Sequence, residues 1–129
     1  MTGPVDVVRR FFALLDATQA AEAVALLSDD VVWRNTGFPA VRGQRVGGML
    51  LDMERRGIAF EARIRHAAAD GPVVLTDRID VLRYKRWESA FPVSGTFEVH
   101  DGRITLWDDR FSPGGVLLAS LKGLVAAAR

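Results

Sequence analysis

The sequence predicts an α+β fold in which helices pack on the concave face of a strongly curved, antiparallel or mixed β-sheet. Two observations predict this fold class. Apolar residues in the first half of the chain recur with the spacing of helices, whereas after about residue 57 they alternate with the period of strands. Helices followed by a run of strands are typical of α+β domains. A length of 129 residues suits one domain over residues 1–129 and is too short for two.

The first half of the chain is expected to hold three helices and one short strand. Apolar spacing predicts a helix over residues 4–16, with Thr2 as a candidate cap, and an alanine-rich helix over residues 18–28. The segment VVWRN, residues 31–35, predicts a short strand, and residues 36–43 predict a turn-rich link. A third helix over residues 45–57 ends where a glycine suits a C-terminal cap.

The second half is expected to form four strands and a closing helix. Alternation predicts strands over residues 58–69, 72–87, 89–100 and 103–111, and the turn sequences ADGP and HDG join antiparallel neighbours. The last helix spans residues 112–128, with a serine as its cap.

The composition argues against several classes of partner. A net charge of +1 without a basic run gives little support to nucleic-acid binding. The chain has no cysteine, and its two histidines, His66 and His100, have no clustered partner at metal-ligand spacing. No apolar stretch approaches the length that crosses a membrane or resembles a signal peptide. We therefore expect a cytoplasmic protein with no metal, no membrane and no nucleic-acid partner.

Two charged side chains interrupt the apolar segment LTDRIDVLRY, residues 75–84. Arg78 and Asp80 share one face of this predicted strand, because side chains alternate between faces. They have two interpretations. The pair either faces solvent, where it would contribute well under about 1 kcal/mol, or faces a site inside the protein.

Two further strands place a polar side chain among aromatic ones. Asp109 shares its face with Trp107 and Phe111, and burial of an unpaired carboxylate there would be costly. Asn35 follows Trp33 on one face of VVWRN, although an asparagine before Thr-Gly is also typical of a turn.

The segments DRID, GTFEVHDGRITLWDDRF and VVWRN resemble, in order and separation, the limonene-1,2-epoxide hydrolase family. This family lies within the cystatin-like (NTF2-like, SnoaL-like) α+β superfamily, which also contains ketosteroid isomerases and polyketide cyclases. The resemblance covers nearly the whole chain, and its most specific part is the Arg-x-Asp strand followed by an aspartate two residues after the Trp of a later strand. It implies a conical pocket and a homodimer formed through the sheet.

The resemblance also implies roles for individual residues. Arg78 matches an arginine that bridges two aspartates, Asp80 matches the proton-donating acid, and Asp109 matches the base that activates water. Asn35 matches the asparagine that helps to hold this water. The family has a tyrosine two residues before that asparagine, where this chain has Trp33, and an indole donates one hydrogen bond but accepts none.

Two carboxylates and one guanidinium suit the addition of water to an epoxide. Buried together they favour retention of one proton, so that one carboxyl is an acid and the other a base. Ring strain then removes the need for a cofactor, a metal or a covalent nucleophile, and the product is a vicinal diol. We expect a small hydrophobic epoxide, such as limonene-1,2-epoxide, to bind against five apolar side chains, for which plain core packing is an equal interpretation: Trp33, Met53, Leu82, Phe111 and Val116.

Two other functions stay open. An isomerase or cyclase of the ketosteroid-isomerase or polyketide-cyclase kind would abstract a proton next to a carbonyl and stabilise the enolate with an oxyanion donor. The Arg-x-Asp pair argues against this function, since an arginine beside the acid disfavours the protonated donor of such sites. The third function is that of a non-catalytic binder of small hydrophobic ligands.

Overall fold

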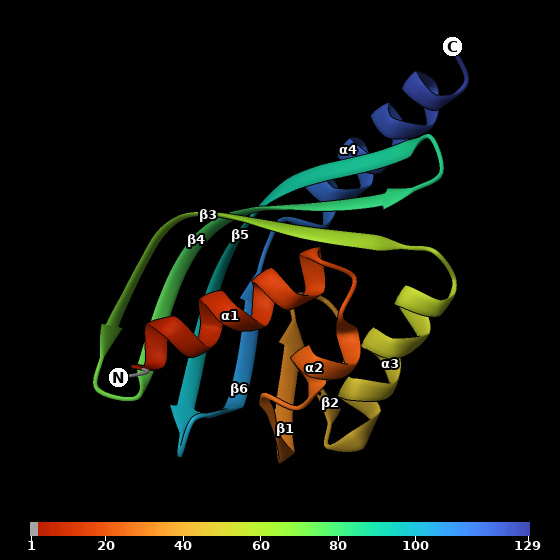
Figure 1. Ribbon diagram of the computed structural model, residues 1–129. Coiled ribbons are helices and arrows are strands. Elements are labelled where there is room, and N and C mark those ends of the chain that lie inside the picture. The colour runs from red at the N-terminus through yellow and green to blue at the C-terminus, as the bar shows by residue number, and fades with distance from the viewer. Residues whose placement is uncertain (1–2) are drawn as a thin grey trace.

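The computed structural model describes residues 3–129, which form one strongly curved, open sheet with helices against it (Figure 1). The strand order is β2-β1-β6-β5-β4-β3, in which β1 and β6 run parallel and the other neighbours run antiparallel. The α+β fold with a mixed sheet is therefore confirmed. In chain order the elements are α1 (Pro4–Asp16), α2 (Ala20–Val24), β1 (Leu27–Asn35), β2 (Val41–Arg42), α3 (Gln44–Arg55), β3 (Ala59–Asp70), β4 (Val73–Tyr84), β5 (Trp87–His100), β6 (Arg103–Arg110) and α4 (Pro113–Ala127).

Aromatic side chains attach α1 to the concave face of the sheet. Phe11 and Phe12 are buried, and both rings meet Trp107 of β6 edge-on, with centroids 5.1 and 6.0 Å away. The ring of Phe12 also meets that of Phe97 on β5 at 5.6 Å. Such edge-to-face contacts add to the free energy gained by burying large rings. The helix consequently lies across the strands, within the bend of the sheet (Figure 1).

The first half of the chain differs from the prediction in two places, and one further prediction is not tested. Thr2, the candidate cap, lies outside the described residues. The alanine-rich helix ends at Val24, and Leu27 instead begins β1, where it is buried and pairs with Ile104 of β6. Strand pairing has overridden the helix propensity of this segment. The expected link contains the two-residue strand β2, because Val41 pairs with Trp33.

The boundary between the strands predicted over residues 72–87 and 89–100 lies earlier in the chain than predicted. The strand β4 ends at Tyr84, a two-residue turn follows, and β5 begins at Trp87, which pairs with Tyr84. Lys85 in this turn has a φ of 54°, a left-handed conformation that Gly, Asn or Asp usually adopts. The predicted break at residue 88 is therefore two residues too late, because Lys85 and Arg86 in the turn are not typical turn residues.

Other predicted boundaries are confirmed. Gly57 follows α3 with a φ of 82°, and the HDG turn joins β5 to β6 with Asp101 and Gly102 at 53° and 75°. The hydroxyl of Ser112 caps α4 by accepting a hydrogen bond from the backbone N–H of Gly115 at 3.1 Å. Within residues 3–129, no helix is long and apolar enough to cross a membrane.

Candidate active site

One row of residues across four strands contributes to the site. Thr76 of β4 pairs with Gly95 of β5, Gly95 pairs with Asp109 of β6, and Asp109 pairs with Asn35 of β1. Thr76 and Asp109 are therefore separated by two strand spacings, roughly 9–10 Å, with the glycine between them. Arg78 lies two residues beyond Thr76 and faces the same side. The register thus brings together polar groups that are distant in sequence.

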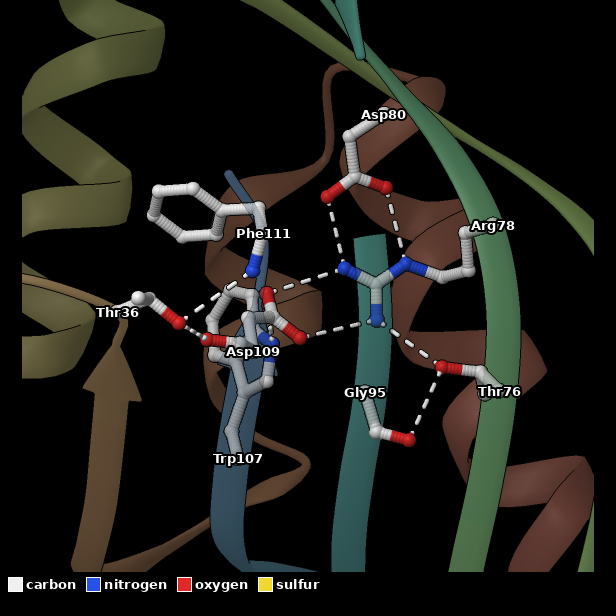
Figure 2. A network of polar contacts seen from close by, with 8 residues as sticks. All are labelled: Thr36, Thr76, Arg78, Asp80, Gly95, Trp107, Asp109 and Phe111. Carbon is white, nitrogen blue, oxygen red and sulfur yellow. Dashed lines mark hydrogen bonds and ion pairs between the residues drawn. The ribbon is translucent and has the colours of Figure 1, made fainter. Parts of the chain in front are cut away.

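The guanidinium of Arg78 lies between the carboxylates of Asp80 and Asp109, and all five of its N–H groups have an acceptor (Figure 2). Nε and Nη2 donate to the two oxygens of Asp80 at 2.9 and 2.7 Å. Nη1 and Nη2 donate to the two oxygens of Asp109, each at 3.0 Å. The remaining N–H, on Nη1, donates to Thr76 Oγ1 at 3.1 Å. Arg78 is 0% exposed, which excludes the interpretation as a surface ion pair.

Further contacts hold this group in place. The guanidinium carbon of Arg78 lies 4.6 Å from the ring centroid of Phe12, a cation–π contact that ties the site to α1. Trp107 Nε1 donates to Asp109 Oδ2 at 2.8 Å, and the backbone carbonyl of Asp109 accepts from the backbone N–H of Thr36 at 3.2 Å. The Asp109 carboxylate therefore accepts three hydrogen bonds, and its backbone is fixed as well.

Burial sets the electrostatics of the site. It raises the pKa of Asp109 to about 6, assisted by the charge of Asp80 and opposed by the charge and hydrogen bonds of Arg78 and by the N–H of Trp107. Burial by itself lowers the pKa of Arg78, but the bonds and charges of the two aspartates raise it above its usual range, so Arg78 stays charged. With a pKa of about 6, Asp109 is about nine-tenths ionised at pH 7 and is a stronger base than an ordinary aspartate.

The two carboxylates open onto a mainly apolar cavity of about 630 Å3. Its size and apolar lining suit a small hydrophobic molecule. All five side chains predicted to contact substrate line this cavity, namely Trp33, Met53, Leu82, Phe111 and Val116. In the described part of the chain, no group of three or more His, Cys, Asp or Glu side chains is placed to hold a metal ion.

The wall beside Asp109 contains two stacked indoles. The rings of Trp33 and Trp107 lie 4.2 Å apart at an angle of 13°. Trp107 donates its N–H to Asp109, whereas Trp33 Nε1 is buried with no partner among residues 3–129. Asn35 lines the cavity in the same cross-strand row as Asp109. This wall therefore offers the amide of Asn35 to the cavity, while the indole N–H of Trp33 is buried within it.

Sequence reasoning missed four residues that hold the site: Phe12, Thr36, Thr76 and Gly95. Thr76 had a signal, because it lies two residues before Arg78 and must share its face. The contribution of Gly95 depends on the strand register, and Phe12 has the same helical spacing as an ordinary core residue.

Comparison with known proteins gives a consistent result. A family model described as the limonene-1,2-epoxide hydrolase catalytic domain matches residues 2–122. The epoxide hydrolase EphG of Mycobacterium tuberculosis is 44% identical over 102 residues, which cover 79% of this chain and 68% of that protein.

Solved structures agree at two levels of similarity. An M. tuberculosis LEH-like epoxide hydrolase superposes with a TM-score of 0.91 and 39% identity, over 97% of this chain and 94% of the other. A protein of Catenulispora acidiphila with a ketosteroid isomerase-like fold has a TM-score of 0.77 and 18% identity, over 89% and 92% of the two chains. At such low identity the second match shows a shared fold alone.

Proposed function

The chain belongs to the limonene-1,2-epoxide hydrolase family, and on that premise we propose that it is an epoxide hydrolase that adds water to a small hydrophobic epoxide in one step. The observation that carries this proposal is the placement of one fully buried arginine between two carboxylates at the wall of an apolar cavity.

In the proposed reaction Asp109 is the base and Asp80 is the acid. Asp109 takes a proton from water while the water oxygen forms a bond to one epoxide carbon. The bond from that carbon to the ring oxygen breaks, and Asp80 delivers a proton to this oxygen. One water is consumed and one vicinal diol is formed. The raised pKa of Asp109 favours its role, because general bases act best when their pKa lies near the working pH.

Arg78 allows one buried aspartate to act as the acid and the other as the base. It is charged, it donates two bonds to each carboxylate, and it holds both at the cavity wall. With one proton shared by the two aspartates, the three groups together carry no net charge, which suits a buried site. The proton that leaves Asp80 is matched by the proton that Asp109 gains, so the total charge is unchanged during the step.

Asn35 and Trp33 are the proposed water and substrate contacts beside the base. Asn35 lies opposite Asp109 in the sheet and lines the cavity. The side-chain amide of Asn35 offers both a donor and an acceptor to water. Trp33 replaces the tyrosine of the family and can only donate, so the water depends more on Asn35 here. Met53, Leu82, Phe111 and Val116 are proposed to surround the apolar part of the substrate.

Turnover of epoxides tests the proposal. Purified protein is incubated with limonene oxide, cyclohexene oxide and styrene oxide, and diol formation is followed. We expect Asp80→Asn and Asp109→Asn to abolish turnover, while the neighbouring Asp108→Asn, which faces the other way, retains it. Absence of diol from every epoxide, or full activity of either catalytic variant, would refute it. Proton exchange on a cyclic ketone without epoxide turnover would instead indicate an isomerase.

We also propose that two chains pair through the outer face of the sheet. Leu75 of β4 is 54% exposed on that face, and α4 carries further exposed leucines, among them Leu117 at 62%. Exposed apolar surface of this kind is typical of interfaces. Light scattering after gel filtration should give a dimer mass, and Leu75→Glu should shift it toward the monomer; a monomeric wild type contradicts the proposal. The cytoplasmic location stays a prediction, which cell fractionation tests.

A further inference from the structure

Two residues outside the substrate cavity, Thr76 and Gly95, lie next to Nη1 of Arg78. We propose that Thr76 and Gly95 are positioning residues, which together fix the plane of the Arg78 guanidinium so that it meets each aspartate with two hydrogen bonds. The inference rests on the proposed function of the site. It concerns residues that do not line the substrate cavity, so they act through Arg78 and not on the substrate.

Thr76 accepts the one N–H of Arg78 that neither carboxylate reaches. The Nε–Nη2 edge of the guanidinium faces Asp80, the Nη1–Nη2 edge faces Asp109, and the last N–H of Nη1 points to Thr76 Oγ1. Thr76 is 5% exposed, so bulk water has little access to this position and would not readily replace the hydroxyl as an acceptor. An unpaired N–H on a buried cation is costly. The threonine therefore completes the set of acceptors and fixes the rotation of the guanidinium.

Gly95 provides the space in which these atoms meet. A Cβ at this position would lie 2.5 Å from Arg78 Nη1, 2.8 Å from Thr76 Oγ1 and 2.9 Å from Asp109 Oδ1. All three separations are far below van der Waals contact, so the atoms around Nη1 occupy the volume of the missing side chain. The carbonyl of Gly95 also accepts the hydroxyl proton of Thr76 at 3.4 Å, which leaves a lone pair of Thr76 for Nη1.

The consequence concerns Asp109 more than Asp80. Asp80 lies on the same strand as Arg78 and receives its Nε and Nη2. Asp109 on β6 receives Nη2 and also Nη1, the nitrogen that donates to Thr76 and occupies the space left by Gly95. If Nη1 moves, the bonds to Asp109 weaken, and these bonds lower the pKa of Asp109. Loss of the positioning residues should therefore make Asp109 harder to ionise. The charged groups near Asp109 are Arg78 and Asp80 from β4, and Arg45 and Glu54 of α3 line the same cavity. Its uncharged neighbours come from the other strands, namely Gly95 of β5, Trp107 of β6, and Trp33 and Asn35 of β1.

The test separates the hydroxyl of Thr76 from the rest of its side chain. Thr76→Val keeps the shape of the side chain and removes the hydroxyl, and Thr76→Ser keeps the hydroxyl. Thr105→Val is the matched control, because Thr105 Oγ1 donates to the carbonyl of Glu98 at 3.3 Å without touching Arg78. Two readouts are taken: the titration of Asp109 by carbon NMR of protein labelled at the aspartate carboxyl, assigned with Asp109→Asn, and the kinetics of epoxide turnover.

We expect Thr76→Val to raise the titration midpoint of Asp109 and to lower kcat by about 10- to 100-fold, by analogy with the losses seen when hydrogen-bond partners that orient metal ligands are removed. KM should change little, and Thr76→Ser and Thr105→Val should behave as wild type. A Thr76→Val protein that titrates and reacts as wild type overturns the proposal, and so does a Thr76→Ser protein that loses as much as Thr76→Val.

A second variant and a readout that needs no substrate ensure that the test gives an answer. If Thr76→Val does not fold, Gly95→Ala takes its place, since it keeps Thr76 but fills the space of Nη1. An upward shift of the Asp109 titration then supports the proposal, and an unchanged titration overturns it. The titration requires no substrate. If no epoxide is hydrolysed, the proposed function fails, yet the NMR result still decides whether Thr76 and Gly95 position Arg78.

Discussion

The raised pKa of Asp109 makes the pH dependence of turnover a direct test of its role as base. Burial raises this pKa to about 6. Asp109 is then about nine-tenths ionised at pH 7 and only about one-tenth ionised at pH 5. Because only the ionised form accepts a proton from water, kcat/KM should fall about tenfold over this interval. An aspartate with the ordinary pKa of about 3.8 would remain more than about nine-tenths ionised at pH 5, and activity would hardly change.

The assay measures initial rates of diol formation from about pH 4.5 to about pH 8, with substrate well below KM, so that the profile reports the free enzyme. Rates without protein are subtracted, since acid alone opens epoxides, and thermal unfolding at each pH shows that the fold persists. Asp108→Asn is the control, because Asp108 is the adjacent carboxylate and pairs with Arg110 at 3.6 Å on the other face. A constant kcat/KM down to about pH 4.5 would refute Asp109 as the base with a raised pKa. An acid limb that moves in Asp108→Asn would refute its assignment to Asp109.

Three further predictions concern stability. The folded-state pKa of Asp109 exceeds its unfolded value, so the stabilisation it contributes is present below about pH 4 and is lost as the pH rises through about 6. In urea unfolding, wild type should lose about 2 kcal/mol relative to Asp109→Asn between about pH 4 and about pH 6. Arg78→Lys keeps the charge but offers three donors in place of five, so urea unfolding should show a loss of about 2–5 kcal/mol and diol formation should cease. In α3, Gly48→Ala should raise the free energy of unfolding by about 0.5–1 kcal/mol in thermal unfolding, because nothing lies within 4 Å of the new Cβ. The neighbouring Gly47→Ala should lower it by about 1–3 kcal/mol, because its Cβ would lie 2.7 Å from a methyl of Val24.

The faces of the strands could be predicted from the sequence because alternation is a local property. Arg78 and Asp80 share a face in LTDRIDVLRY, and both are buried on it. Element boundaries were less predictable where long-range pairing decides them. Leu27 follows an alanine-rich helical pattern, yet its pairing with Ile104 places it in a strand. Lys85 turns the chain in a left-handed conformation that no local pattern of the sequence indicates.

The candidate site could be predicted only in part. The alternation of side chains predicts which face of a strand a residue occupies, but it does not predict how that strand pairs with its neighbours. That Arg78 should reach Asp109 came from resemblance to a family. The contacts of Thr76 and Gly95 follow from the pairing of β4 with β5 and of β5 with β6, and a single sequence does not fix this pairing. The stacking of Trp33 on Trp107 likewise depends on how β1 lies beside β6.

An irregularity in β1 explains how Asn35 comes to lie beside Asp109. Between two paired positions, β1 advances five residues, from Leu27 to Val32, while β6 advances only two, from Ile104 to Leu106. Had the pairing continued without this shift, Asp109 would lie opposite Val32, and Asn35 would lie past the end of β6. The shift is three residues, an odd number, so it also moves the side chains that follow it in β1 to the opposite face of the sheet. The position of the amide relative to the base is therefore set by extra residues outside the cavity, within the segment SDD of β1.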